Sequence, residues 1–130
     1  MGSDKLSEVK LYQLALAAQQ ATDAECAKFP PFEGLAQSIQ IKKAAKAAVA
    51  HIEEAYGRHS VRDRLGLLGL ATESMENVRK GLANSLKTKL IKQPEFDKLT
   101  ADWAAAQVEA DTYVSFLESG GEMESPLPGV

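Results

Sequence analysis

Apolar residues recur along this chain at intervals of three and four, the spacing that places side chains on one face of an α-helix. No stretch shows the strict alternation of apolar and polar residues that is typical of a β-strand. The pattern predicts four helices, over about residues 7–28, 33–56, 60–91 and 94–117. Because the connections are short, consecutive helices should be antiparallel, which predicts an all-α, up-down-up-down antiparallel four-helix bundle.

Each predicted helix has one apolar stripe that we expect to face the core. The most regular stripe lies in the last helix, which starts near Pro94 and repeats at alternating steps of three and four. Its members are Phe96, Leu99, Trp103, Ala106, Ala110, Tyr113 and Leu117. The first helix is expected to bury Leu11, Leu14, Ala18, Thr22 and Cys26. The second is expected to bury Leu35, Ile39, Ala45, Val49, Ile52 and Tyr56, and the third Val61, Leu65, Leu68, Met75, Leu82, Leu86 and Leu90.

The first and third helices carry more apolar residues than one core stripe requires. The additional strips are Val9, Tyr12 and Leu16 in the first helix, and Leu67, Leu70 and Val78 in the third. Large exposed apolar patches are rare on monomeric proteins, so this surplus predicts a homo-oligomer. Each glycine within the third helix weakens it by up to about 1 kcal/mol. We expect a neighbouring backbone to pass close to Gly66, Gly69 and Gly81.

The composition is that of an ordinary globular domain, with 130 residues, 45% hydrophobic and 25% charged. We expect one bundle domain over residues 1–118 and a flexible C-terminal tail over residues 119–130. No apolar run of about 18 residues and no apolar leader occurs, so neither a membrane span nor a membrane partner is expected. The single cysteine, Cys26, cannot form an internal disulfide, and we expect a cytoplasmic location.

Charge is segregated along the chain, although the net charge is only -3. Residues 35–92 hold 11 basic and 5 acidic side chains, a net charge of +6, whereas residues 93–130 hold 1 basic and 8 acidic ones, a net charge of -7. A local excess of bases can bind an anionic partner, and it can also be neutralised by acidic helices beside it. The candidate phosphate-binding residues are Lys42, Lys43, Lys46, Arg58, Arg62 and Arg64. No aromatic residue is interleaved with them, so they lack the stacking platform of single-strand binders.

The junction between the second and third helices contains a set of turn and cap residues. Ser60 is a good N-cap, and Asp63 three residues later approximates a capping box. Gly57 is expected to take a positive backbone angle, so that Gly57→Val would cost more than about 1 kcal/mol. Glu54 is expected to accept hydrogen bonds near the turn that Tyr56 and Gly57 make, or to pair with Arg58.

Few residues resemble a reaction centre. The group His51, Glu54, His59 and Asp63 contains metal-ligating residue types, but di-iron bundles need two Glu-x-x-His motifs and two further glutamates, which are missing. Cys26 lies on an apolar stripe and is better explained as a small buried residue than as a nucleophile. There is no glycine-rich phosphate loop. We therefore expect no metal, no cofactor and no enzymatic activity.

Three short motifs around this junction resemble those of a known family. Its Gln-Ile-Arg-Arg-Ala-Ala, Asn-Ile-x-Glu-Gly and Gly-Arg-x-Ser motifs are similar to Gln40-Ile41-Lys42-Lys43-Ala44-Ala45, His51-Ile52-Glu53-Glu54-Ala55 and Gly57-Arg58-His59-Ser60. The family comprises bacterial four-helix bundle proteins encoded in intervening sequences of large-subunit ribosomal RNA genes. The accessory variability determinant of diversity-generating retroelements is similar to it. This chain departs from the family's motifs at Lys42, Lys43, His51 and Ala55.

The resemblance covers about residues 6–117 and implies a pentameric ring of five bundles with no established enzymatic activity. We therefore expect a non-enzymatic homo-oligomeric scaffold or adaptor, whose first partner is itself. The alternative is a nucleic-acid-binding accessory protein, which would bind RNA or DNA through a basic ring formed by the second and third helices.

Overall fold

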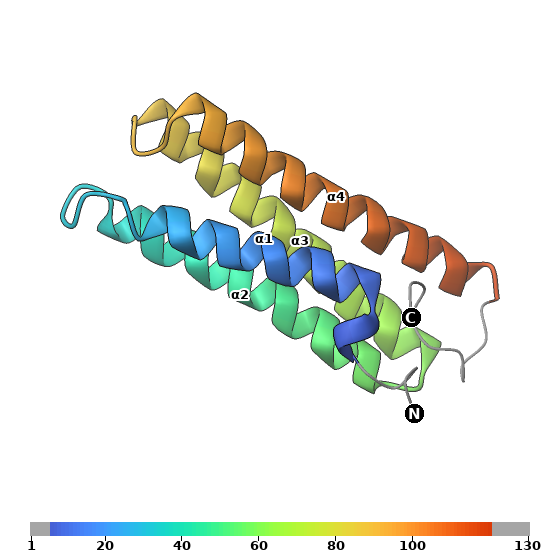
Figure 1. Ribbon diagram of the computed structural model, residues 1–130. Helices are drawn as coiled ribbons and strands as arrows, with labels where there is room; N and C mark the ends of the chain where they lie inside the picture. Colours follow the sequence, from blue (N-terminus) through green and yellow to red (C-terminus); the bar gives the residue numbers. More distant parts are fainter. Residues whose placement is uncertain (1–5, 121–130) are drawn as a thin grey trace.

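The computed structural model describes residues 6–120, which form four α-helices preceded by a 3₁₀ turn and contain no β-strand. The elements are η2 (Leu6–Glu8), α1 (Lys10–Cys26), α2 (Leu35–Gly57), α3 (Val61–Lys87) and α4 (Gln93–Glu118). Each helix runs antiparallel to the one before it (Figure 1), which confirms the predicted all-α architecture. Apart from its first two residues, the expected flexible tail lies outside the described residues.

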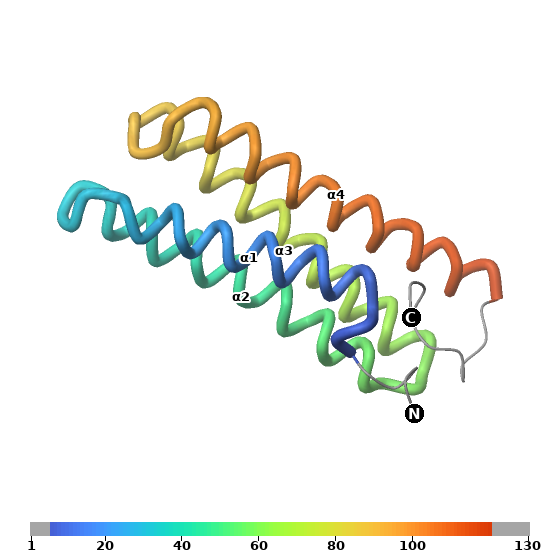
Figure 2. Tube along the Cα trace, in the orientation of Figure 1, coloured from blue at the N-terminus to red at the C-terminus, as the bar shows by residue number. Residues whose placement is uncertain are grey.

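The four helices form a closed square in cross-section. The helix α2 packs against α1 and α3, and α4 packs against the same two helices from the opposite corner. The α2–α3 turn and the end of α4 lie at one end of the bundle, while the α1–α2 and α3–α4 loops lie at the other (Figure 2). The faces of α2 and α4 that point away from the core are therefore on opposite sides of the molecule.

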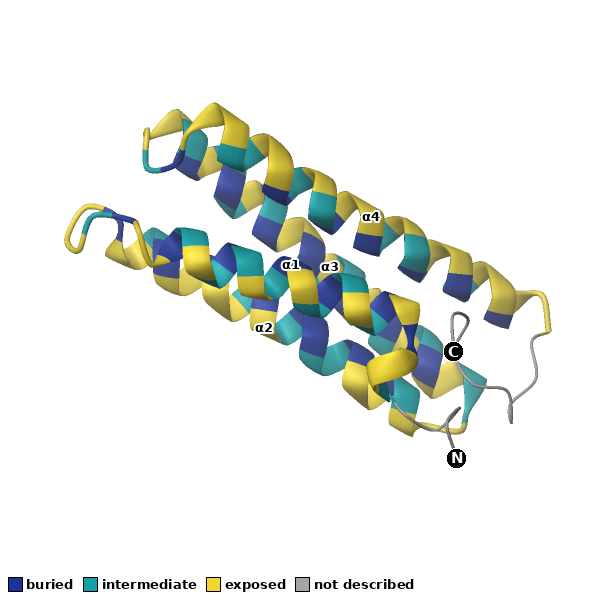
Figure 3. Cartoon of the chain, viewed as in Figure 1, coloured by how far each residue is buried: buried dark blue, intermediate teal, exposed yellow. Residues whose placement is uncertain are grey.

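Every helix buries one stripe whose members are three or four residues apart, as Figure 3 shows by colour. The stripes are Leu11, Ala15, Ala18, Thr22 and Cys26 in α1; Ser38, Ile41, Ala45, Ala48, Ile52 and Ala55 in α2; Leu68, Ala71, Met75, Val78, Leu82 and Ser85 in α3; and Leu99, Trp103, Ala106, Ala110, Tyr113 and Leu117 in α4. The stripe predicted for α4 is confirmed, except that its first member, Phe96, is only partly buried.

Two expected core residues of α2 are not in the core. Leu35 is 54% exposed and Ile39 is 55% exposed. They are out of phase with the buried stripe, which starts at Ser38 and Ile41. The expectation favoured large apolar side chains, whereas the helix buries small residues that let its neighbours approach closely.

The third helix is shorter than expected. It ends at Lys87 rather than near residue 91, because Lys89 takes a left-handed conformation with φ of 63° and the backbone N–H of Leu90 donates to the carbonyl oxygen of Ser85. Most of the surplus apolar residues predicted for the first and third helices are not exposed. Val9 and Val78 are fully buried, Tyr12, Leu16 and Leu67 are partly buried against the core, and Leu70 is 46% exposed.

One of the three glycines of α3 meets the expectation of a close approach. A Cβ atom at Gly81 would lie 2.6 Å from Cγ1 of Ile41, so α2 and α3 pack closely at this level. The neighbour is a side chain rather than a backbone. At Gly66 and Gly69 a Cβ atom would meet nothing within 4 Å, so packing within this chain does not explain them.

Candidate functional site

The predicted basic cluster separates into two groups. Lys42, Lys43 and Lys46 are exposed near the middle of α2, and Arg58 and Arg62 are exposed at the α2–α3 turn. Lys46 and Arg58 are twelve residues apart on a nearly continuous helix, which places them about 18 Å apart along its axis. The sequence-based expectation that these bases gather around the turn therefore needs correction.

Arg64, the sixth predicted base, belongs to the interior of the bundle. It is only 6% exposed. Its Nε–H donates to the carbonyl oxygen of Arg58 at 2.7 Å, and its Nη1–H donates to the Tyr113 hydroxyl at 3.0 Å. The side chain thus fastens the α2–α3 turn to α4, and its burial removes it from the predicted phosphate-binding set. A signal was available, because Arg64 is in phase with the buried stripe of Leu68 and Ala71.

The cap at the start of α3 is confirmed. The backbone N–H of Asp63 donates to Ser60 Oγ at 3.3 Å, and Ser60 has the extended conformation of an N-cap. Glu54 does not accept hydrogen bonds from the turn; its Oε1 lies 3.5 Å from Nδ1 of His51, one turn earlier in α2. Tyr56 is partly buried and packs against the core.

The expectation for Gly57 is wrong. Gly57 is the last residue of α2, and among the described glycines only Gly120 has a positive φ, of 96°. The chain leaves α2 through Arg58 in an extended conformation, with φ of -92° and ψ of 154°. A Cβ atom at Gly57 would meet nothing within 4 Å. The expected penalty for Gly57→Val from a left-handed backbone therefore does not apply.

The environment of Cys26 agrees with its assignment as a buried apolar residue. Burial raises the pKa of the Cys26 thiol to about 11, and the nearby Asp23 carboxylate adds to the rise. Within the described part of the chain, no group of three or more His, Cys, Asp or Glu side chains is placed to hold a metal ion. Among the helices of residues 6–120, none has both the length and the apolar character needed to cross a bilayer.

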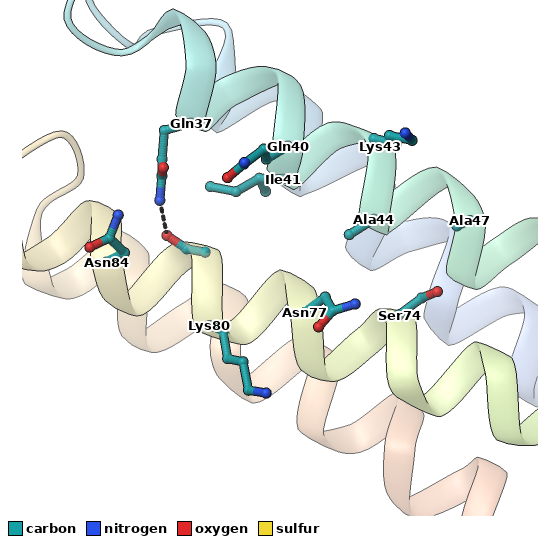
Figure 4. Close-up of a pocket in the computed structure, with 11 residues that line it drawn as sticks. Gln37, Gln40, Ile41, Lys43, Ala44, Ala47, Ser74, Asn77, Lys80 and Asn84 are labelled. Carbon is teal, nitrogen blue, oxygen red and sulfur yellow. Dashed lines mark hydrogen bonds between the residues drawn. The ribbon is translucent and has the colours of Figure 1, made fainter.

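The structure contains a groove between α2 and α3 that was not predicted (Figure 4). Its cavity has a volume of about 540 Å³, with Ile41, Ala44, Ala47 and Gly81 at its base. The remaining lining residues are Gln37, Gln40, Lys43, Ser74, Asn77, Lys80 and Asn84. Gln37 Nε2 donates to the carbonyl oxygen of Gly81 at 3.1 Å and ties the two walls together at one end.

A pattern in the sequence corresponds to this groove. Most of its lining residues follow the steps 37, 40, 44, 47 in α2 and 74, 77, 81, 84 in α3, each one residue before a buried position. The small and amide residues at these positions form a second helical seam beside the core seam. The groove carries two lysines and no carboxylate, so its walls favour an anionic ligand or partner.

A second hollow of about 400 Å³ lies near the turn, over the first half of α3. It is lined by Arg58, Arg62, Asp63, Gly66, Leu67 and Leu70. Gly66 faces this open space, and Leu70 beside it is 46% exposed. The hollow thus combines an apolar floor with the two exposed arginines of the turn.

Large apolar side chains are also exposed elsewhere on the bundle. Phe32, in the α1–α2 loop, is 88% exposed, and Leu35 and Ile39 follow it at steps of three and four. On the other side of the molecule, Val108 of α4 is 65% exposed. Exposed apolar surface was expected on the first and third helices, whereas most of the exposed large apolar residues lie on α2 and α4.

Comparison with known proteins gives one match. The model of a family described as 23S rRNA-intervening sequence protein matches residues 7–107. Neither the curated proteins nor the solved structures gave a match. The matched span runs from the turn before α1 into α4, so it includes the α2–α3 groove and both groups of exposed bases.

Proposed function

The chain belongs to the family of 23S rRNA-intervening sequence proteins, and on this premise we propose that it is a non-enzymatic, homo-oligomeric scaffold or adaptor. The assembly is a ring of bundles, five in number if the chain follows the pentameric barrel that its sequence resemblance implies. The similarity to the accessory variability determinant of diversity-generating retroelements stays a prediction.

The observation that carries this proposal is the exposed apolar series Phe32, Leu35 and Ile39. These side chains are 88%, 54% and 55% exposed, and they follow one another at steps of three and four from the α1–α2 loop into the start of α2. A lone exposed apolar residue needs no explanation, but a contiguous group of large ones is typical of an interaction surface. Covering such a group with another copy would stabilise the assembly by roughly 25 cal/mol for each Å² of apolar surface removed from water.

Sedimentation velocity combined with light scattering tests this proposal. One chain has a mass of 14.0 kDa, so a pentamer would appear at about 70 kDa. The measurement should be repeated with Leu35→Ser/Ile39→Ser, which we expect to lower the assembled fraction without unfolding the bundle. A matched control is Ala17→Ser/Ala24→Ser, which changes two exposed residues of α1. A single 14.0 kDa species at all concentrations would reject the proposal.

A second candidate function, nucleic-acid binding, is favoured by the five bases that remain exposed. Lys42, Lys43 and Lys46 project from one helix, and Arg58 and Arg62 from the turn. Contacts from such side chains would be made to phosphates and would weaken steeply as salt concentration rises.

A gel-shift titration with RNA and DNA, single- and double-stranded, at about 50 mM and about 200 mM salt tests this alternative. Lys42→Glu/Lys46→Glu should weaken any shift, while Lys87→Glu/Lys92→Glu, with the same change of charge elsewhere on the surface, should not. If no shift occurs at either salt concentration, the alternative is wrong.

A further inference from the structure

We propose that copies of this chain join head to tail, with the outer face of α4 of one copy lying in the α2–α3 groove of the next. The inference rests on the proposed homo-oligomer and adds to it the two surfaces that meet. Charge, exposure and the relative positions of the two surfaces carry the argument.

The groove between α2 and α3 has a basic surface without carboxylates, and it runs along both helices. Lys43 extends from α2 and Lys80 from α3, each pointing away from the other helix (Figure 4), and neither takes part in an ion pair within residues 6–120. The positions that form its base are mostly small, namely Ala44, Ala47 and Gly81. A second helix can approach closely where side chains are small, and the two lysines would then flank it.

The outer face of α4 has the complementary character. The helix holds six acidic residues and one basic residue. Its outward stripe repeats at steps of four and three, and consists of Asp97, Ala101, Ala104, Val108, Asp111 and Ser115. Val108, at 65% exposure, is the large apolar residue of this stripe. The Asp111 carboxylate has no ion-pair or hydrogen-bond partner within the described residues, and the Asp97 carboxylate accepts a hydrogen bond only from Gln93 Nε2 at 2.8 Å.

The two surfaces cannot neutralise each other within one copy. The helix α4 lies across the core from α2, so its outer stripe and the α2–α3 groove lie on different faces of the bundle. Each copy therefore presents one basic and one acidic surface that only another copy can match. Contacts between two different surfaces of the same chain are heterologous, and they propagate from copy to copy until a ring closes.

Charge reversal with rescue tests the pairing. Lys43→Glu/Lys80→Glu on the groove, or Asp97→Lys/Asp111→Lys on α4, should each raise the dissociation constant of the assembly by roughly tenfold or more, because the two apposed surfaces then carry charge of the same sign. The chain that carries all four changes should assemble again, since both surfaces are reversed. Sedimentation velocity over a concentration series gives the dissociation constants, and thermal melts followed by circular dichroism show whether each variant is folded.

Matched controls change the net charge equally on other surfaces. Lys87→Glu/Lys92→Glu and Glu53→Lys/Glu76→Lys alter exposed residues outside the groove and the α4 stripe, and should assemble like the unmodified chain. If a reversal unfolds the bundle, the neutral variants Lys43→Gln/Lys80→Gln and Asp97→Asn/Asp111→Asn make the same test, with weaker assembly expected for both.

Three outcomes are decisive. An unmodified chain that remains a 14.0 kDa species rejects the proposed homo-oligomer, and with it this inference. An assembly that neither reversal weakens leaves the homo-oligomer standing and rejects the pairing of α4 with the groove. Weakening by both reversals without recovery in the fourfold variant also rejects it, because the two surfaces would then act separately.

Discussion

Two buried donor side chains, those of Trp103 and Arg64, each have an acceptor on another element. The indole N–H of Trp103 donates to Thr22 Oγ1 at 2.9 Å, and the hydroxyl of Thr22 donates to the carbonyl oxygen of Ala18 at 2.7 Å. Arg64 bonds to Arg58 and Tyr113. Because a buried donor without a partner costs about 1–3 kcal/mol, these bonds fix how the helices are placed relative to one another.

The Trp103–Thr22 bond gives a prediction at the scale of single residues. Thr22→Val keeps the side-chain shape but leaves the indole N–H without an acceptor, so it should lower the free energy of unfolding by about 1–3 kcal/mol. The control is Thr112→Val on the exposed face of α4, where Thr112 Oγ1 bonds to the carbonyl oxygen of Val108 at 2.9 Å; it should change stability by less than about 0.5 kcal/mol. Urea unfolding measures both, and equal effects would contradict the prediction.

The raised pKa of Cys26 predicts how stability depends on pH. At pH 8 the thiol is protonated in both states and has no effect. Between about pH 9 and 11 the unfolded chain loses this proton first, because the pKa of the thiol is raised from 9.0 to about 11 by folding. The free energy of unfolding should therefore fall by roughly 2–3 kcal/mol across this range.

Comparison with Cys26→Ala isolates this contribution, since Tyr113, whose pKa burial also raises, titrates in both chains. The stability gap between the two chains should narrow as the pH rises from 8 to 10.5 in reducing buffer. A gap that stays constant would show that Cys26 does not titrate as proposed.

At the scale of the helices, the hydrophobic pattern predicted which segments are helical, and the structure moves their ends by one to four residues. The pattern was less informative about which face is buried. Where the stripe contains large apolar residues, as in α4, the face was predicted correctly. Where the buried residues are alanine and serine, as in α2, larger neighbours such as Leu35 and Ile39 were wrongly placed in the core.

The candidate site was harder to predict for a physical reason. The groove forms where small residues of α2 and α3, among them Ala44, Ala47 and Gly81, come together, and this pairing is a property of the two helices together rather than of either sequence stretch. The conformation of Gly57 likewise depends on how the chain leaves α2 at Arg58, whose carbonyl oxygen is held by Arg64 six residues later. Ser60 was predictable because a cap is a local interaction.

The close approach of α2 and α3 gives a prediction at the scale of the helices. Gly81→Ala places a Cβ atom 2.6 Å from Cγ1 of Ile41, a buried side chain, and should destabilise the fold by about 1–3 kcal/mol despite the better helix propensity of alanine. Gly69→Ala, in the same helix but in open space, should stabilise it by up to about 1 kcal/mol. Thermal melts of the two variants should shift in opposite directions; shifts of the same sign would show that the packing at Gly81 is looser than described.

At the scale of the whole molecule, basic and acidic side chains are separated on different sides of the bundle. The groove side is basic and the α4 side is acidic, so the chain has a pronounced dipole in spite of its small net charge. Such a dipole favours ordered association and makes it sensitive to ionic strength.

This dipole predicts that sodium chloride weakens self-association. Raising the salt from about 0.1 M to about 1 M shortens the Debye length from about 10 Å to about 3 Å, so the dissociation constant of the assembly should rise. Assembly through the apolar series Phe32, Leu35 and Ile39 alone would be unchanged or strengthened. Light scattering at both salt concentrations distinguishes the two, and an assembly insensitive to salt would argue against a charge-driven contact.

The abundance of small residues in the buried stripes sets an upper limit on side-chain volume along the whole axis of the bundle. Ten of the buried stripe positions are alanine or serine: Ala15, Ala18, Ser38, Ala45, Ala48, Ala55, Ala71, Ser85, Ala106 and Ala110. At these positions little side chain remains to be removed, while a larger side chain would push two helices apart. Few buried positions can therefore accept a smaller side chain, and almost none can accept a larger one. Most tolerated substitutions should lie at exposed positions on the surface of the bundle.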